Sequence, residues 1–68
     1  MSKVKIFLNG EGRICEKMTI SKLVETLGLD IKKIAVEKDL EVVNSADYTK
    51  ITIDEGSRIE IVHFIGGG

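Results

Sequence analysis

The dipeptide Asn9-Gly10 is the feature that most constrains how this chain folds. Both residues tolerate the positive φ angles that a tight turn between two strands requires. Before the turn, residues 4–8 place an apolar side chain at every second position, which indicates a strand with one face on a core. Residues 13–18, with Ile14 and Met18 on one face, are interpreted as the returning strand, and Gly12 as a second flexible point of the turn. The chain therefore begins with a predicted β-hairpin.

An amphipathic helix is predicted directly after this hairpin. Thr19 suits the N-cap position, because its hydroxyl accepts a hydrogen bond from a backbone N–H that the first turn leaves unpaired. The residues that follow place apolar side chains along one helical stripe, namely Ile20, Leu23, Val24 and Leu27. Gly28 supplies the left-handed residue that commonly ends a helix.

The second half of the chain is predicted to be mostly strand. Residues 34–37 form a short strand, Lys38-Asp39 a turn, and residues 40–43 an edge strand, followed by an irregular stretch with one helical turn near Tyr48. Residues 58–65 form the last strand, and their apolar character on both faces is typical of a strand in the middle of a sheet. The predicted fold class is α+β, a mixed sheet of about five strands with one main helix packed across one face.

Length and composition exclude several classes of protein. The chain has 68 residues, which allow one domain at most. Its net charge of −1 provides no cationic field for nucleic acid, and no apolar run approaches the ~20 residues of a membrane span. The first residues lack the apolar run of a signal peptide, so a cytoplasmic location is expected.

Residue counts also argue against an enzyme. There is one His, one Cys and one Tyr, so neither an internal disulfide nor a cysteine-based zinc site is possible, and we expect no bound cofactor or metal. Cys15 is either an inert strand residue, the interpretation we favour, or a persulfide carrier. His63 is expected to pack or to hydrogen-bond, because no nucleophile that it could activate is evident. The chain is therefore expected to be a substrate or carrier for larger enzymes.

The last strand is followed by three glycines, Gly66, Gly67 and Gly68. Glycine has no Cβ and takes almost any backbone conformation, so such a tail suits entry into the enclosed site of another enzyme. We expect a domain over residues 1–65 and a flexible tail over 66–68. Phe64, with Val62 on the same face, is the expected docking surface beside the tail. The alternative is that the glycines are a frayed terminus or a cloning remnant.

Four stretches of the sequence resemble the ThiS family of sulfur carriers, which has the ubiquitin-like β-grasp fold. They are residues 4–10 (VKIFLNG), residues 19–27 with their Leu-Val-x-x-Leu core, residues 34–37 (IAVE) and residues 59–68 (IEIVHFIGGG). The last is the most specific, because members of the family commonly end in this way.

The resemblance implies a chemistry for the terminal carboxylate. A ThiF-type activating enzyme would use ATP to adenylate Gly68, and sulfur derived from a cysteine desulfurase would then displace AMP to give a thiocarboxylate. A ThiG-type thiazole synthase would take the sulfur for the thiazole of thiamin. Gly66 and Gly67 would enter the partner's active site, and the partner-facing surface would comprise Val62, Phe64 and Ile65. Two alternatives stay open: the small subunit of molybdopterin synthase, with the same tail chemistry, and a β-grasp interaction module without chemistry.

Overall fold

The computed structural model of the protein describes residues 2–64. Its elements follow one another in the order β1 (Lys3–Leu8), β2 (Glu11–Glu16), α1 (Ile20–Thr26), the 3₁₀ turn η1 (Ile31–Lys33), β3 (Ile34–Lys38), β4 (Glu41–Val43), the 3₁₀ turn η2 (Ser45–Asp47) and β5 (Arg58–His63).

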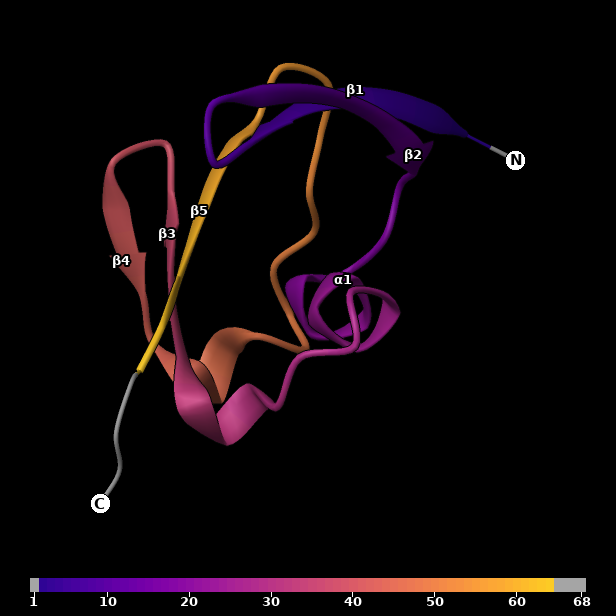
Figure 1. Ribbon diagram of the computed structural model, residues 1–68. Coiled ribbons are helices and arrows are strands. Elements are labelled where there is room, and N and C mark those ends of the chain that lie inside the picture. Colours follow the sequence, from indigo (N-terminus) through magenta and orange to yellow (C-terminus); the bar gives the residue numbers. More distant parts are fainter. Residues whose placement is uncertain (1, 65–68) are drawn as a thin grey trace.

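The strands form one five-stranded sheet in the order β2-β1-β5-β3-β4. Neighbouring strands are antiparallel except β1 and β5, which run parallel, so the sheet is mixed. Figure 1 shows α1 on one side of this sheet, and no helix of residues 2–64 covers the other side. The face away from α1 is called the open face below. The predicted α+β architecture is confirmed.

The first hairpin is tighter than the sequence analysis predicted. Leu8 pairs with Glu11 directly across Asn9-Gly10, whose φ angles of 49° and 85° are both positive. The second strand therefore starts at Glu11 and ends at Glu16, two residues earlier at each end than predicted, and Gly12 lies inside it. The predicted shared face of Ile14 and Met18 is also wrong, because this register puts Ile14 opposite Lys5 on the open face, whereas Met18 packs against the core.

The predicted caps of the helix are both confirmed. The Thr19 hydroxyl oxygen accepts a hydrogen bond from the Lys22 N–H at 3.1 Å. At the other end Gly28 has a φ of 75°, its N–H donates to the Glu25 carbonyl, and the Leu29 N–H donates to the Val24 carbonyl. This pair of bonds is the Schellman motif, and it satisfies carbonyls that the last turn would leave unpaired.

The turn between β3 and β4 lies one residue later than predicted. Asp39 and Leu40, with φ angles of 51° and 72°, occupy it, so Leu40 belongs to the turn and not to the edge strand. Asp39 is held by β5, because its N–H donates to the Arg58 carbonyl and its Oδ1 accepts from the Arg58 N–H. The pairing of β3 with β5 thus continues through Asp39 and moves the turn outward. Nothing among residues 2–64 explains why a leucine occupies the second position.

Strand β5 lies in the middle of the sheet, as predicted, but it is buried on one face only. Ile59 is fully buried beneath the sheet, whereas Val62 is exposed on the open face. The strand ends at His63; Phe64 follows it, and Ile65 lies outside the described residues. On the open face Val62 is accompanied by Arg58 and Glu60, so the apolar character predicted for both faces does not extend over the open face.

The core lies between the sheet and α1, with contributions from the loop that leads to β5. Eleven buried apolar residues form it, namely Val4, Ile6, Ile20, Leu23, Val24, Ile34, Val36, Val43, Tyr48, Ile53 and Ile59. All five strands except β2 contribute to this set, since β2 adds only the half-buried Cys15. The edge strand β2 is therefore the least firmly packed part of the sheet.

Two isoleucines on neighbouring strands test this packing with the same chemical change. Ile6 is 0% exposed on β1, whereas Ile14 is 70% exposed on β2. We expect Ile6→Val to lower the free energy of unfolding by about 1 kcal/mol, because one buried methylene is lost. Ile14→Val should change it by less than about 0.5 kcal/mol. Urea unfolding of the two variants measures the difference, and equal losses would contradict the register of the hairpin.

Candidate functional site

The candidate site lies where the chain leaves the sheet at the end of β5. The last backbone hydrogen bond there joins the Phe64 N–H to the Lys33 carbonyl at 2.8 Å, so the chain is held to the domain up to that residue. Lys33 belongs to the exposed turn η1. The predicted tail residues Gly66, Gly67 and Gly68, together with Ile65 and the predicted domain boundary after it, lie outside the described residues.

Two apolar side chains beside this exit are exposed. Val62 is 60% exposed on β5 and Phe64 is 58% exposed just beyond it. A hollow next to the exit measures about 500 Å³ and is lined by Ile31, Lys32, Ile34, Ser45, Tyr48 and Phe64. It is larger than the hollow of about 310 Å³ beside β4. The exit therefore combines exposed apolar surface with a depression in which a partner's side chain has room.

Charge divides the open face of the sheet into two halves. On the β1 side, the Lys5 ammonium and the Arg58 guanidinium lie 5.7 Å and 6.0 Å from the centre of the Phe7 ring, within range of cation–π attraction. On the other side, Glu37 of β3 lies directly opposite Glu60 of β5. Like charges directly opposite each other destabilise a sheet, so this half of the face favours a partner that supplies positive charge.

Asn9 joins the first hairpin to β5 in a way that sequence reasoning missed. Its backbone N–H donates to the Ile59 carbonyl, and its side-chain Oδ1 accepts from the Ile61 N–H at 2.8 Å. The side-chain oxygen thus takes the place of the backbone carbonyl of Asn9, at the point where the parallel pairing ends. Asparagine was identified only as a residue that tolerates positive φ, and its amide oxygen was the one available signal of a second role.

The two single residues singled out in the sequence have different outcomes. Cys15 is half-buried and packs against the core beside Val4, a location that fits the inert strand residue we favoured. His63 is exposed, and its imidazole makes no hydrogen bond to another residue among 2–64, so the expectation that it packs or hydrogen-bonds finds no support in the described part of the chain. It lies opposite Ile34 at the end of the strand, where the buried face of the sheet ends.

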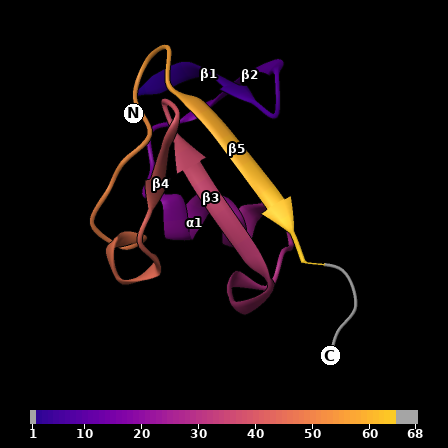
Figure 2. The same ribbon diagram turned by 90° about the vertical axis from the view of Figure 1, so that its left-hand side faces the viewer.

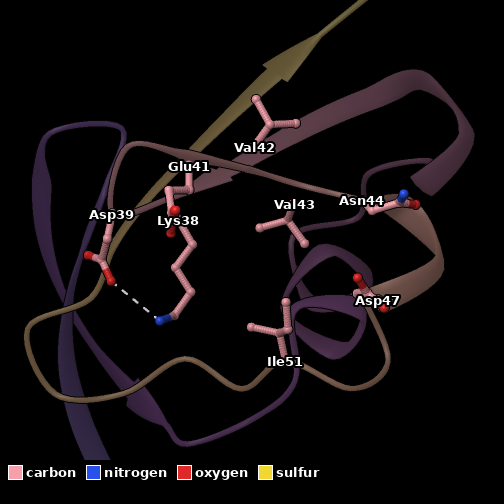
Figure 3. Close-up of a pocket in the computed structure, with 8 residues that line it drawn as sticks. All are labelled: Lys38, Asp39, Glu41, Val42, Val43, Asn44, Asp47 and Ile51. Atoms are coloured by element: carbon pink, nitrogen blue, oxygen red, sulfur yellow. Dashed lines mark hydrogen bonds and ion pairs between the residues drawn. The ribbon is translucent and has the colours of Figure 1, made fainter.

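A second hollow, of about 310 Å³, lies between β4 and the loop that follows η2 (Figure 3). Its wall is formed by Lys38, Asp39, Glu41, Val42, Val43, Asn44, Asp47 and Ile51, and the Lys38 ammonium points to the Asp39 carboxylate at 3.3 Å. The hydrogen bond from the backbone N–H of Arg58 lowers the pKa of Asp39; burial opposes this effect, and the neighbouring Lys38 ammonium adds to it. This carboxylate therefore has a structural partner and supports the turn.

The described part of the chain offers little other chemistry. Among residues 2–64 no three His, Cys, Asp or Glu side chains lie close enough together to hold a metal ion. Within the same residues no helix has the length and apolar character needed to span a membrane. The exit of the tail is thus the strongest candidate site.

Comparison with known proteins identifies the relatives of this chain. The sequence model of the ThiS family matches residues 3–68. A thiazole synthase of Paramagnetospirillum magneticum is 42% identical over 66 residues, which cover 96% of this chain and 20% of that protein. The sulfur carrier protein ThiS of Bacillus subtilis is 36% identical over 50 residues, which cover 74% of this chain and 76% of that protein. The crystal structure of the thiamine biosynthesis protein (ThiS) from Geobacter metallireducens superimposes with a TM-score of 0.82 at 23% identity and covers 96% of this chain and 100% of that one.

These likenesses define the class of the protein and then its family. The structural match shows that the mixed sheet crossed by one helix is the ubiquitin-like β-grasp fold, as predicted. The chain belongs to the ThiS family, since the family model covers nearly all of it. It spans about a fifth of the length of the thiazole synthases that it matches.

The lowered pKa of Asp39 leads us to expect that this carboxyl group contributes to the loss of stability in acid. A carboxyl group whose pKa in the folded state lies below its ordinary value of 3.8 stabilises the fold above that value. This contribution is lost as the pH falls through the lower, folded-state pKa. Asp39→Asn keeps an acceptor for Arg58 and a residue that tolerates positive φ, but removes the titration. We therefore expect the drop in unfolding free energy between about pH 5 and about pH 2 to be smaller in the variant, as measured by urea unfolding. An unchanged drop would show that the bond to Arg58 does not affect the carboxyl group's titration.

Proposed function

We propose that this protein is a sulfur carrier of thiamin thiazole synthesis whose working group is the carboxylate of Gly68. The protein is a co-substrate of larger enzymes and is not an enzyme itself. The observation that carries the proposal is the family match, which extends through the three terminal glycines.

The proposed chemistry has three steps before sulfur is delivered. A carboxylate oxygen of Gly68 attacks the α-phosphorus of ATP in a ThiF-type activating enzyme, and pyrophosphate leaves. The outer sulfur of a donor persulfide, charged by a cysteine desulfurase, then attacks the acyl carbon, and AMP leaves to give an acyl disulfide. A thiol reductant finally attacks the donor's sulfur and breaks the S–S bond, which releases the thiocarboxylate and leaves the donor and the reductant joined as a disulfide. The carrier binds no cofactor, because the activating enzyme binds the ATP.

The geometry at the end of β5 supports this assignment. The backbone bond between Phe64 and Lys33 holds the chain to the sheet, and four residues follow it to the carboxylate. Fully extended, four residues span ~13 Å, which is enough to enter another enzyme's site while the domain remains outside. Glycines have no side chain to clash at the narrow part of such a site.

The exposed apolar residues near the exit supply the proposed docking surface. Ordering a tail costs ~1–2 kcal/mol per residue, so neighbouring surface must contribute binding free energy. Val62 and Phe64, with Ile65 beyond them, are proposed to do so, since both described side chains are more than half exposed.

The proposed acceptor of the sulfur is a thiazole synthase of the ThiG type. Two relatives that bear this name contain a stretch 42% identical to this chain within a polypeptide about five times as long. This likeness supports the proposal that a carrier of this kind meets a thiazole synthase during sulfur transfer. All of these enzymes are expected in the cytoplasm, where we also place the carrier.

The position of the terminal carboxylate provides a sharp test. An alanine added after Gly68 turns the glycine carboxylate into an amide and moves the new carboxylate ~3.5 Å along the chain. We expect this extended protein to be activated at least ~100-fold more slowly, because displacements of even ~1 Å can have that effect. The measurement is AMP formation with the activating enzyme and ATP, together with intact mass after sulfur transfer.

The matched control for this test adds the same alanine before Met1. It changes the composition identically and leaves Gly68 free, so activation should equal that of the unmodified protein. Urea unfolding of both proteins checks that the fold is unaffected. Normal activation of the C-terminally extended protein, without trimming, would refute the role of Gly68.

Cys15 provides a second test, which separates the carboxylate from the thiol. The half-buried thiol has no part in the proposed chemistry. We therefore expect Cys15→Ser to accept sulfur within about twofold of the wild-type rate, although burying a hydroxyl lowers stability by about 1 kcal/mol. Intact mass should show the exchange of one oxygen for one sulfur. Complete loss of this product from a folded variant would revive the persulfide alternative.

A further inference from the structure

The two halves of β5 differ in what lies beside them. Strand β3 pairs with β5 along its whole length, up to Ile34 opposite His63. Strand β1 pairs only with Arg58 and Ile59 at its start. Figure 2 shows the result: the C-terminal half of β5 has β3 on one side and no strand on the other. A central strand thus becomes an edge strand just before the chain leaves the sheet.

The hydrogen-bond pattern identifies which backbone groups this edge presents. The Asp39 N–H donates to the Arg58 carbonyl and the Phe64 N–H donates to the Lys33 carbonyl, so the even-numbered residues of β5 bond to β3. In an antiparallel pair the residues between them direct their N–H and C=O groups to the opposite side. On that side Ile61 uses its N–H to bond Asn9 Oδ1. The Ile61 carbonyl and the N–H and carbonyl of His63 make no hydrogen bond to any other residue among 2–64.

Within residues 2–64, this edge lacks the features that usually protect an edge strand. Natural proteins block edges with proline, with charged side chains, with a bulge or with a covering loop. The chain has no proline, and the exposed residues beside the free groups are Val62, His63 and Phe64. Asn9 blocks the edge only as far as Ile61. One donor and two acceptors therefore remain in register for another strand.

We propose that an extended segment of the sulfur-accepting enzyme pairs with β5 beside Ile61–His63 and adds a sixth strand to the sheet. The proposal rests on the function proposed above, in which that enzyme is a thiazole synthase. His63 lies five residues before Gly68, so the two are at most ~17 Å apart along an extended chain. An enzyme that holds the carboxylate in its active site therefore has surface within reach of this edge.

Strand addition accounts for two requirements of the transfer at once. Main-chain hydrogen bonds provide affinity, while Val62 and Phe64 on either side of His63 provide side-chain specificity. Pairing also fixes the direction in which the chain leaves the domain, which reduces the conformational entropy that the tail loses on entering the site.

Amide hydrogen exchange of the unmodified protein tests the pairing directly. We expect exchange at the His63 N–H to slow at least about tenfold when the protein is saturated with thiazole synthase. The matched control is the Ile14 N–H on β2, which also points outward from a sheet edge, since β2 bonds to β1 through the residues on either side of it. Its exchange should not change. A complex in which His63 exchanges as fast as in the free protein would overturn the proposal, and so would protection of His63 that depends only on carrier concentration, which would indicate self-association.

A pair of substitutions at His63 tests the consequence for transfer. His63→Ala removes the side chain and keeps the N–H, whereas His63→Pro also removes the N–H, which the domain itself does not use. We expect His63→Ala to deliver sulfur to thiazole synthase within about twofold of wild type, and His63→Pro about tenfold more slowly. Both should still be adenylated, because the inference concerns the acceptor enzyme alone.

The outcomes separate this inference from the proposed function. If the wild-type protein gives no thiocarboxylate, the proposed function is wrong and the inference falls with it. If thiocarboxylate forms and His63→Pro delivers sulfur as fast as His63→Ala, only the inference is wrong. Circular dichroism establishes whether His63→Pro is folded, and if it is not, the exchange measurement on the unmodified protein decides.

Discussion

The parallel pairing of β1 with β5 is the contact on which the rest of the structure depends. It joins two hairpins that are otherwise separate, β1–β2 and β3–β4, into one sheet with one buried face. The pairing is short, with Phe7 opposite Arg58 and Leu8 opposite Ile59, and it is lengthened by the two bonds of Asn9. Because the partners lie about fifty residues apart in the chain, closing this contact costs more entropy than forming either hairpin. The short pairing also leaves the second half of β5 with a free edge.

Local chemistry made the ends of the helix predictable, whereas the strand registers depended on distant contacts. Thr19 and Gly28 were identified from their own side chains, because capping involves only residues of the adjoining turn. The register of β2 could not be read in the same way. A two-residue turn fixes it: with Leu8 opposite Glu11, Ile14 lies opposite Lys5 on the open face and Gly12 becomes part of the strand. The turn at Leu40 moved for a related reason, since a hydrogen bond from Arg58, nineteen residues from Asp39, extends the pairing.

The central position of β5 was predicted correctly, but the reason given for the prediction does not hold in the structure. Apolar residues on both faces of a strand usually mean burial on both faces, yet Val62 is open to solvent. A sheet covered by one helix buries only one face, and on the other face β5 carries Arg58 and Glu60 beside the exposed Val62. The candidate site could likewise be predicted only in part. Exposure of Val62 and Phe64 agrees with the prediction, their contact with a partner is a proposal, and the free edge at His63 depends on where β1 ends, which no local pattern reveals.

In the proposed function, the end of the domain has to hold the chain in place, whereas the glycine tail has to enter a narrow site. Phe64 lies between these two parts. Glycines allow the carboxylate to enter a narrow site, but each glycine loses more conformational entropy on ordering than any other residue. A carrier with a longer glycine segment would therefore reach further and bind more weakly. Among the described residues, the bond from Phe64 to Lys33 is the last one that holds the chain to the sheet. In the proposed function, four residues separate this bond from the carboxylate of Gly68. In the proposed function this short distance explains why the docking surface and the free edge both lie at the carboxyl end of β5: binding free energy gained there acts on the segment that has to be held.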